Sequence, residues 1–301
     1  MAVSSDLFNG VDLSRLPPPT VVAQLSYADI LTAALADAEA IIPDFNARTD
    51  ADPVVKLVQY LAAKEFFLRA QFNAQAQAVL LPSATGPDLD ALAAFYNLER
   101  FIVTPANEDT GAPAVLETDE AFRARIVRAP EALSVAGPVT AYVALALQAD
   151  ARVKAASCIS PNPGEVLVSI LSNEGDGAAD ADLIATVNAF LSAEERRPLT
   201  DALTVQSATI VPFQIEAELR TFSGAGSQVA IAEARARLDV WLAENHRLGR
   251  DITEDGVLAA LRGTNAGVSR VQLIGWQDVV CDETEAAWAS QITTTHIGAG
   301  Q

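Results

Sequence analysis

The sequence predicts an α+β protein in which a helical N-terminal half is followed by two small α/β units, with helices packed on mainly antiparallel or mixed sheets. Three observations predict this fold class. Apolar residues recur at helical spacing through most of the first half, and from residue 152 the period changes to that of β-strands. Strands and helices then alternate twice, which indicates two small sheets that each carry helices on one face. The periodicity leaves open whether the two units share one sheet.

Two helices are expected first. Residues 21–42 carry apolar side chains at helical spacing, and Pro43 ends this helix. Residues 51–81 form the strongest helical pattern, with Pro53 in the first turn, and at 1.5 Å per residue the helix would run roughly 40 Å. Its apolar face comprises Val54, Leu57, Val58, Leu61, Leu68, Phe72 and Val79. Two interpretations stay open: a long core helix of its own domain, or an arm whose stripe packs in a bundle with helices of another chain.

Shorter helices and one connection complete the first half. In "TGPDLDALAAFYNL", residues 85–98, Asp88 is the candidate N-cap. Residues 102–116 combine prolines and glycines with polar residues, which predicts an exposed connection and a domain boundary. Helices are expected at residues 118–133 and 137–148. We therefore expect a helical region at residues 1–112, helices plus the first α/β unit at 113–205, and a C-terminal α/β unit at 206–301.

The second half alternates strands with helices. Strands are expected at residues 152–160, 165–172, 202–208, 210–222 and, as the final strand, 268–276. Helices are expected at residues 181–193, 227–245 and 253–263. The strand at 210–222 shows the clearest alternation, with Phe213, Ile215, Ala217 and Leu219 on one face and Gln214, Glu216, Glu218 and Arg220 on the other.

Composition limits the partners. The chain has 301 residues with 39 acidic and 20 basic side chains, a formal net charge of -19, which makes nucleic-acid binding and attraction to an anionic membrane unfavourable. No apolar run approaches the roughly 18 residues of a membrane span, so we expect no membrane insertion. A mean hydropathy of +0.21 suggests apolar surface that is buried against other chains. Cys158 and Cys281 stand far apart without a redox motif, which suits a reducing compartment and a chain that is cytoplasmic when made.

No catalytic, cofactor-binding or metal site is expected. His246 and His296 are the only histidines, and neither belongs to a zinc-binding helix motif. Residues 173–182 are rich in carboxylates but lack the spacing of a calcium loop, and they are expected to end in an aspartate that caps a helix. Residues 223–228 are glycine-rich but lack the third glycine of a dinucleotide fingerprint. The alternative function kept open is a ligand-binding or enzymatic α/β protein that uses these two loops.

The stretch "ENHRLGRDI", residues 244–252, concentrates charge at the end of a predicted helix. Arg247 is expected in the last turn, where a cation favours the helix dipole, and Gly249 in a left-handed C-cap. "DITED" then starts the next helix with acidic residues in its first turn. Each residue therefore has a local structural reason to be there.

Together with other stretches, this one carries a family resemblance. "HRLGRDI" followed by a helix and "VSRVQL" resembles the C-terminal signature of the baseplate J-like assembly proteins of contractile phage tails. In the expected order, so do "LSRLPPPTVVAQLSYADIL", the long helix with "GPDLDALAAFYNLER", "EALSVAGPVTAYVALALQADARV", "PNPGEVLVSIL", "RRPLTDALTVQSA" and "FQIEAEL". The resemblance spans most of residues 13–274 and is thin over the last 25 or so residues.

The resemblance implies a structural role without catalysis. Members of this family are baseplate wedge components whose N-terminal helices bundle with a tail-protein-I-like partner, with a sheath-initiator-like protein nearby. Their C-terminal domains join copies into a ring around the tail hub, which makes residues 206–301 the expected self-association region. We expect assembly in the host cytoplasm and a final place in the baseplate of a virion or tail-like particle.

Two sets of residues are the expected interface or structural corner. The first is the family motif, in which Arg250 and Asp251 are expected to fix the corner between two helices and to contact a neighbouring copy. It comprises His246, Arg247, Gly249, Arg250 and Asp251. The second set lies on the long helix and comprises Leu57, Leu61, Leu68 and Phe72.

Overall fold

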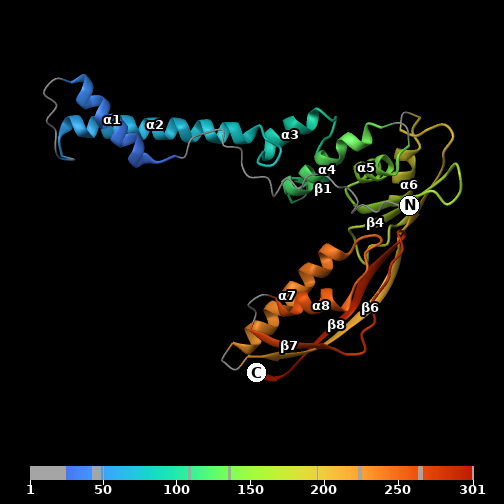
Figure 1. The fold of residues 1–301 in the computed structure, drawn as a ribbon. Helices are drawn as coiled ribbons and strands as arrows, with labels where there is room; N and C mark the ends of the chain where they lie inside the picture. Colours follow the sequence, from blue (N-terminus) through green and yellow to red (C-terminus); the bar gives the residue numbers. More distant parts are fainter. Residues whose placement is uncertain are drawn as a thin grey trace. The chain divides into compact units, whose positions relative to one another are not determined.

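A computed structural model describes residues 25–42, 49, 51–107, 110–134, 137–194, 196–222, 226–263 and 267–299. These residues form two compact units, each described by itself below (Figure 1). The helical unit comprises the described residues of Val11–Arg100 together with Thr118–Arg123. The mixed unit comprises those of Phe101–Glu117 and of Ala124–Gln301.

The helical unit is built on a helix pair. Helix α1 spans Tyr27–Ile41 and packs along α2, Pro53–Ala78. The side chain of Asp52 accepts a hydrogen bond of 2.9 Å from the Val54 amide, and Pro53 occupies the first turn, so a carboxylate cap and a fixed φ start the helix. Few residues hold the pair together. Among the described residues of the two helices, the buried apolar side chains are those of Ile30, Val55, Val58 and Ala62.

A second cluster forms around helix α3, Gly86–Ala94. The guanidinium of Arg100 binds Asp90 at 2.5 Å and Asp119 at 2.6 Å. Asp119 also accepts from the Gly86 amide at 3.1 Å, and these two interactions lower the pKa of its carboxyl. Arg123 donates to the carbonyls that end the α2–α3 turn. These bonds fasten the start of α3 to the first turn of α4, Asp119–Ala132, the helix that continues into the mixed unit.

The mixed unit begins with a small hairpin and a central sheet. Strands β1, Ile102–Thr104, and β2, Val115–Leu116, pair antiparallel. The central sheet has the order β3-β4-β5, with β3, Val153–Ile159, antiparallel to β4, Glu165–Ser172, and β5, Ala202–Ser207, parallel to β4. Helices α5, Val139–Ala149, and α6, Ala181–Leu191, pack on this sheet. Asp180 caps α6 by accepting from the Leu183 amide at 2.7 Å.

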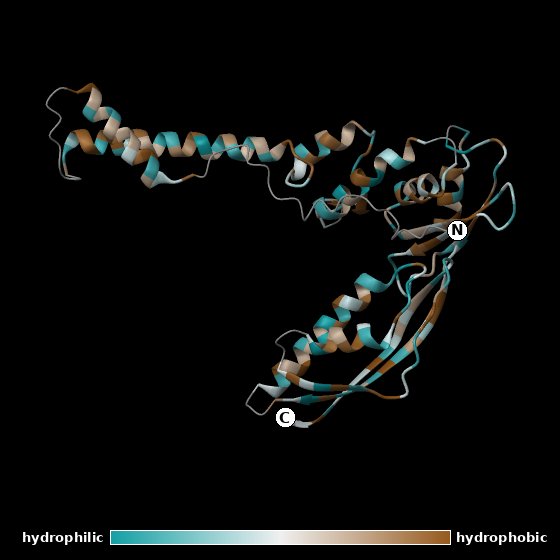
Figure 2. Cartoon of the chain, viewed as in Figure 1, coloured by the Kyte–Doolittle hydropathy of each residue, from teal (hydrophilic) through white to brown (hydrophobic). Residues whose placement is uncertain are grey.

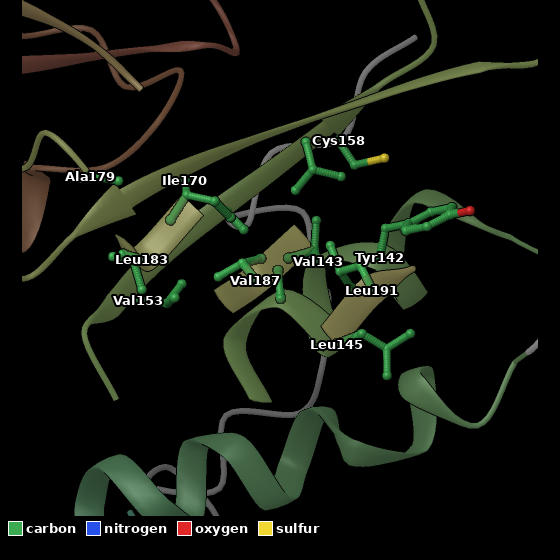
Figure 3. Packing of buried hydrophobic residues seen from close by; sticks show 13 residues of the cluster. Tyr142, Val143, Leu145, Val153, Cys158, Ile170, Ala179, Leu183, Val187 and Leu191 are labelled. Atoms are coloured by element: carbon green, nitrogen blue, oxygen red, sulfur yellow. The ribbon is translucent and has the colours of Figure 1, made fainter. Parts of the chain in front are cut away.

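The central core lies between these helices and the strands. Figure 3 shows Val143 of α5 and Val187 of α6 pointing toward Ile170 of β4 and Cys158 of β3. Cys158 and Cys281 are both free and buried. Burial raises the pKa of the Cys158 thiol to about 12 and that of Cys281 to about 11.

The C-terminal sheet has the order β7-β6-β8. Its central strand β6, Thr209–Thr221, is antiparallel to β7, Val268–Leu273, and parallel to β8, Glu285–Ala299. Helices α7, Ser227–Asn245, and α8, Glu254–Arg262, cover one face, where Ile215, Ala217 and Leu219 are buried (Figure 1). On the other face of β6, Gln214 and Glu216 are exposed and Glu218 is partly exposed.

The predicted α+β class is confirmed, and each α/β unit has its own mixed sheet. Three local predictions were wrong. The first helix starts at Tyr27 after the Ser26 cap, since residues 25 and 26 are not helical. Asp88 is not the N-cap of α3, because the turn places Thr85 there and Asp88 in the first turn. The strand at 268–273 is not the final one, because β8 follows it.

The central core provides a stability test. Leu183 is 1% exposed and Leu199 is 97% exposed. We expect Leu183→Ala to lower the free energy of unfolding by about 2–5 kcal/mol, because it removes buried methyl groups and leaves a cavity. Leu199→Ala is the matched control and should change it by less than about 0.5 kcal/mol. Urea unfolding of the full chain measures both, and equal effects would contradict this packing.

Candidate interaction sites

The first candidate site is an apolar stripe on α2. Leu57, Leu61, Leu68 and Phe72 are 58%, 56%, 65% and 62% exposed, and Val54 at the start of the helix is 41% exposed. Their spacing of three, four and seven residues places them on one side of the helix. Figure 2 shows hydrophobic residues recurring along α2 among hydrophilic ones. We call these five residues the α2 stripe.

Helix α1 covers the flank beside the α2 stripe and leaves the stripe itself open. Val55, Val58 and Ala62 are the buried residues of α2. The ring of Tyr27 on α1 meets that of Phe66 edge-on at 6.4 Å, and its hydroxyl donates to the Gln59 carbonyl at 3.3 Å. Within the described residues, the α2 stripe is therefore not part of a core. An apolar row of this kind on a protein surface is a candidate interaction site.

The second candidate site is the loop between α7 and α8, residues 246–253, which we call the corner. Helix α7 ends at Asn245, so the prediction that Arg247 lies in its last turn was wrong. The predicted bound at residue 245 is confirmed, and Arg247 lies two residues beyond it. Gly249 has the expected left-handed backbone, with φ +68°, but it stands beyond the helix cap. Helix α8 starts as expected, with Glu254 and Asp255 in its first turn.

His246 is the buried centre of the corner. The residue is 5% exposed, Nδ1 donates to the Ala287 carbonyl at 2.8 Å, and the ring packs against that of Trp288 in an edge-type contact with 5.1 Å between the ring centroids. Nε2 is buried without a hydrogen-bond partner in the described structure. It faces Gly177, where a Cβ would lie 2.6 Å away. The corner therefore packs directly against the loop that follows β4.

Burial lowers the pKa of His246, although the bond to Ala287 acts in the opposite direction. Lys154 on β3 lowers the pKa further, and Asp176 raises it. A second proton on Nε2 would have no hydrogen-bond acceptor, because Nε2 is buried without a partner in the described structure. The ring is therefore neutral, with its proton on Nδ1.

The remaining side chains of the corner bind within the chain. Arg250 Nε donates to the Asn245 side chain at 3.0 Å, and an Asp251 carboxylate oxygen accepts from the Cys281 amide at 2.9 Å. Leu248 is fully buried in a cluster with Ala155, Leu171, Ala208 and Ala286. Arg247 is exposed. The five sequence-predicted corner residues thus share one loop in the mixed unit, whereas the other predicted set lies on α2 in the helical unit.

The corner also covers the outer edge of β8. The Gly249 amide donates to the Glu285 carbonyl at 2.9 Å, Leu248 bridges to Ala286, and His246 reaches Ala287. Further along, Arg235 of α7 donates to the Ile292 carbonyl at 2.9 Å. Sequence reasoning missed β8 and with it the carbonyls that accept from Gly249 and His246. The signal was present in "ITTTHI", residues 292–297, where β-branched residues dominate.

The two loops of the alternative function are used structurally where they are described. In residues 173–182, Asp180 caps α6 and Asp182 pairs with Arg152 at 2.9 Å. Residues 223–225 of the second loop lie outside the described residues. In the described ranges, no group of three or more histidine, cysteine or acidic residues is arranged to hold a metal ion. None of the described helices combines the length and apolar character that a bilayer crossing needs.

Two family models match the chain: the baseplate J-like N-terminal domain at residues 50–107 and the baseplate J-like central domain at residues 134–207. The chain is 40% identical over 291 residues to baseplate protein J of Escherichia phage P2, covering 93% of this chain and 96% of that protein. The chain belongs to the baseplate J-like family. It is therefore a baseplate component, and the α2 stripe lies within the part matched by the N-terminal domain model.

A solved structure, the baseplate of the anti-feeding prophage, is also similar to this baseplate J-like chain. The match has 14% identity and a TM-score of 0.38. It covers 60% of this chain and 42% of that one.

The buried histidine makes stability depend on pH. The lowered pKa of His246 means that the unfolded chain binds more protons than the folded one below about pH 6.5, so acidification lowers the free energy of unfolding. The slope for one proton is at most about 1.4 kcal/mol per pH unit. We expect His246→Gln to remove this slope between about pH 6.5 and 5.5, whatever it does to stability at neutral pH. Denaturation at a series of pH values measures it.

His296→Gln is the matched control, because the chain has only two histidines and this variant keeps the buried one. An unchanged slope in His246→Gln would show that His246 is not the titrating group.

The bond between Arg250 and Asn245 can be isolated by a double-mutant cycle. We expect Arg250→Ala to cost about 1 kcal/mol of unfolding free energy in the native background and close to nothing in an Asn245→Ala background. Chemical denaturation of the four proteins gives the coupling energy. Fully additive effects would mean that Arg250 does not fix the corner.

Proposed function

We propose that this chain is a wedge component of a contractile-tail baseplate. In this role its helical unit binds a tail-protein-I-like partner, a sheath-initiator-like protein packs nearby, and its C-terminal α/β unit joins copies of the chain around the tail hub. The chain assembles in the host cytoplasm and has a structural rather than an enzymatic role. It needs no cofactor, nucleic acid or membrane insertion.

The single observation that carries this proposal is the exposed α2 stripe. Each of its residues would release apolar surface from water on binding, worth roughly 1.5–3 kcal/mol per fully buried large side chain. Helix α1 already covers one flank of α2, so the α2 stripe is the apolar row that is left for a helix of a partner. A helix that lays its own apolar face along this row completes a small bundle.

The charge of the chain fits a partner chosen by shape and apolar contact. With a formal net charge of -19, the chain would repel other acidic surfaces at long range. The α2 stripe is free of charge, although Glu65 and Arg69 form an ion pair within the same helix. Apolar contacts therefore provide the affinity, and charged residues beside them restrict which helices can approach.

The test is co-expression with a tail-protein-I-like protein from the same source, followed by purification and light scattering. We expect a stable complex with the native chain and its loss with the double variant Leu61→Asp and Leu68→Asp, because two carboxylates would be buried in the bundle. Both residues are more than half exposed, so the free variant should fold as the native chain does.

Ala74→Asp is the matched control, since it adds a carboxylate at an exposed position of α2 away from the stripe. It should leave the complex intact. A double variant that still co-purifies with the partner would exclude the α2 stripe as the interface, and a native chain that ignores the partner would overturn the proposed function.

A further inference from the structure

The outer edge of β8 is divided into two parts. In the first part, the carbonyls of Glu285, Ala287 and Ile292 accept from Gly249, His246 and Arg235, as described above. Beyond Ile292 the strand continues to Ala299. In the described residues no strand pairs with this second part on the side away from β6, because β8 is the edge of its sheet.

The direction of the open groups follows from the strand geometry. The Ile292 carbonyl points away from β6, toward Arg235. Backbone groups of alternate residues point to opposite edges of a strand, so the amides and carbonyls of Thr294 and His296 also point outward. Thr293, Thr295 and Ile297 direct theirs toward β6, in agreement with the continuous parallel register from Gln214 to Leu219.

This open segment lacks the features that normally protect an edge strand. Natural edges carry lysine, proline or inward charges that prevent pairing with another chain. From Ala286 to Ala299, β8 contains neither a proline nor an acidic or basic residue apart from His296. In a chain with a formal net charge of -19, an uncharged strand is where two copies can approach without repulsion.

We propose that β8 of one copy pairs antiparallel with β8 of a second copy, about a two-fold axis that passes through Thr295. This inference rests on the proposed self-association and specifies its surface. With this register Thr294 of one copy faces His296 of the other, and the two outward residues exchange both of their backbone hydrogen bonds. The two-fold axis generates the same pair of hydrogen bonds a second time, so one continuous six-stranded sheet spans the two copies. At the axis, Thr295 of one copy faces Thr295 of the other, which is a favourable cross-strand pair.

Disulfide trapping in the full chain tests the register. In a non-hydrogen-bonded antiparallel pair the Cα atoms lie about 4.5 Å apart, within reach of a disulfide. Thr295→Cys should therefore form a covalent dimer on mild oxidation. Thr293→Cys is the matched control, because it faces Ile297 of the second copy; it should stay monomeric alone and form a mixed dimer with Ile297→Cys. The native cysteines are buried and remain in place.

A second pair of variants tests the hydrogen bonds. Thr294→Pro removes an amide that points to the open edge and leaves the pairing of β6 with β8 intact, whereas Thr294→Val keeps the amide. We expect self-association of Thr294→Pro to be weaker by roughly tenfold or more, because two hydrogen bonds per pair of copies are lost, and that of Thr294→Val to be unchanged. Sedimentation measures both.

The outcomes separate this inference from the proposed function. Trapping at 295 but not at 293, with loss of association in Thr294→Pro alone, supports the pairing of β8 strands. If the native chain self-associates and binds its tail-protein-I-like partner, but 295 does not trap or traps no better than 293, the pairing is wrong and the proposed function stands. If the native chain neither self-associates nor binds the partner, both are wrong.

Discussion

The parallel pairing of β6 with β8 is the interaction on which the rest of the mixed unit depends. It runs from Thr209 and Glu285 to Thr221 and Ala299, and it joins segments more than 70 residues apart. A strand added at the edge of a sheet has a row of outward backbone groups that must find donors and acceptors. Because α7 ends where it does, the corner can supply donors to that row. The bend between the helices, the orientation of His246 and the close approach to Gly177 all follow from this requirement.

The sequence pattern predicted those features that depend on neighbouring residues in the chain. The start of α2 was predictable from Pro53, the cap of α6 from an aspartate, and the buried face of β6 from strict alternation ending at Leu219. Strand β8 was not predicted, because its first half is rich in alanine and it becomes a strand through pairing with a distant segment. The end of α7 at Asn245 was predicted correctly, but the hydrogen bond from His246 to Ala287 was not, because the sequence pattern did not show where Ala287 lies.

The two candidate sites differ in how far the chain satisfies them by itself. At the corner, the side chains of His246, Arg250 and Asp251 each have a hydrogen-bond partner inside the same chain, so they hold the shape of the loop. The α2 stripe is the opposite case, since its leucines and Phe72 remain exposed in the described structure. Periodicity alone could not separate a core helix from an interface helix, because both bury one apolar side. Only the exposure of that side distinguishes them.

The two buried thiols have a consequence for how such a plate is held together. Cys158 and Cys281 lie inside separate cores, and burial raises the pKa of each well above neutrality, so neither supplies the thiolate that attacks a disulfide. The chain can therefore pass between reducing and oxidising surroundings without forming covalent links to its neighbours. The contacts that this chain makes with its neighbours can therefore be broken and remade without chemical change to the chain.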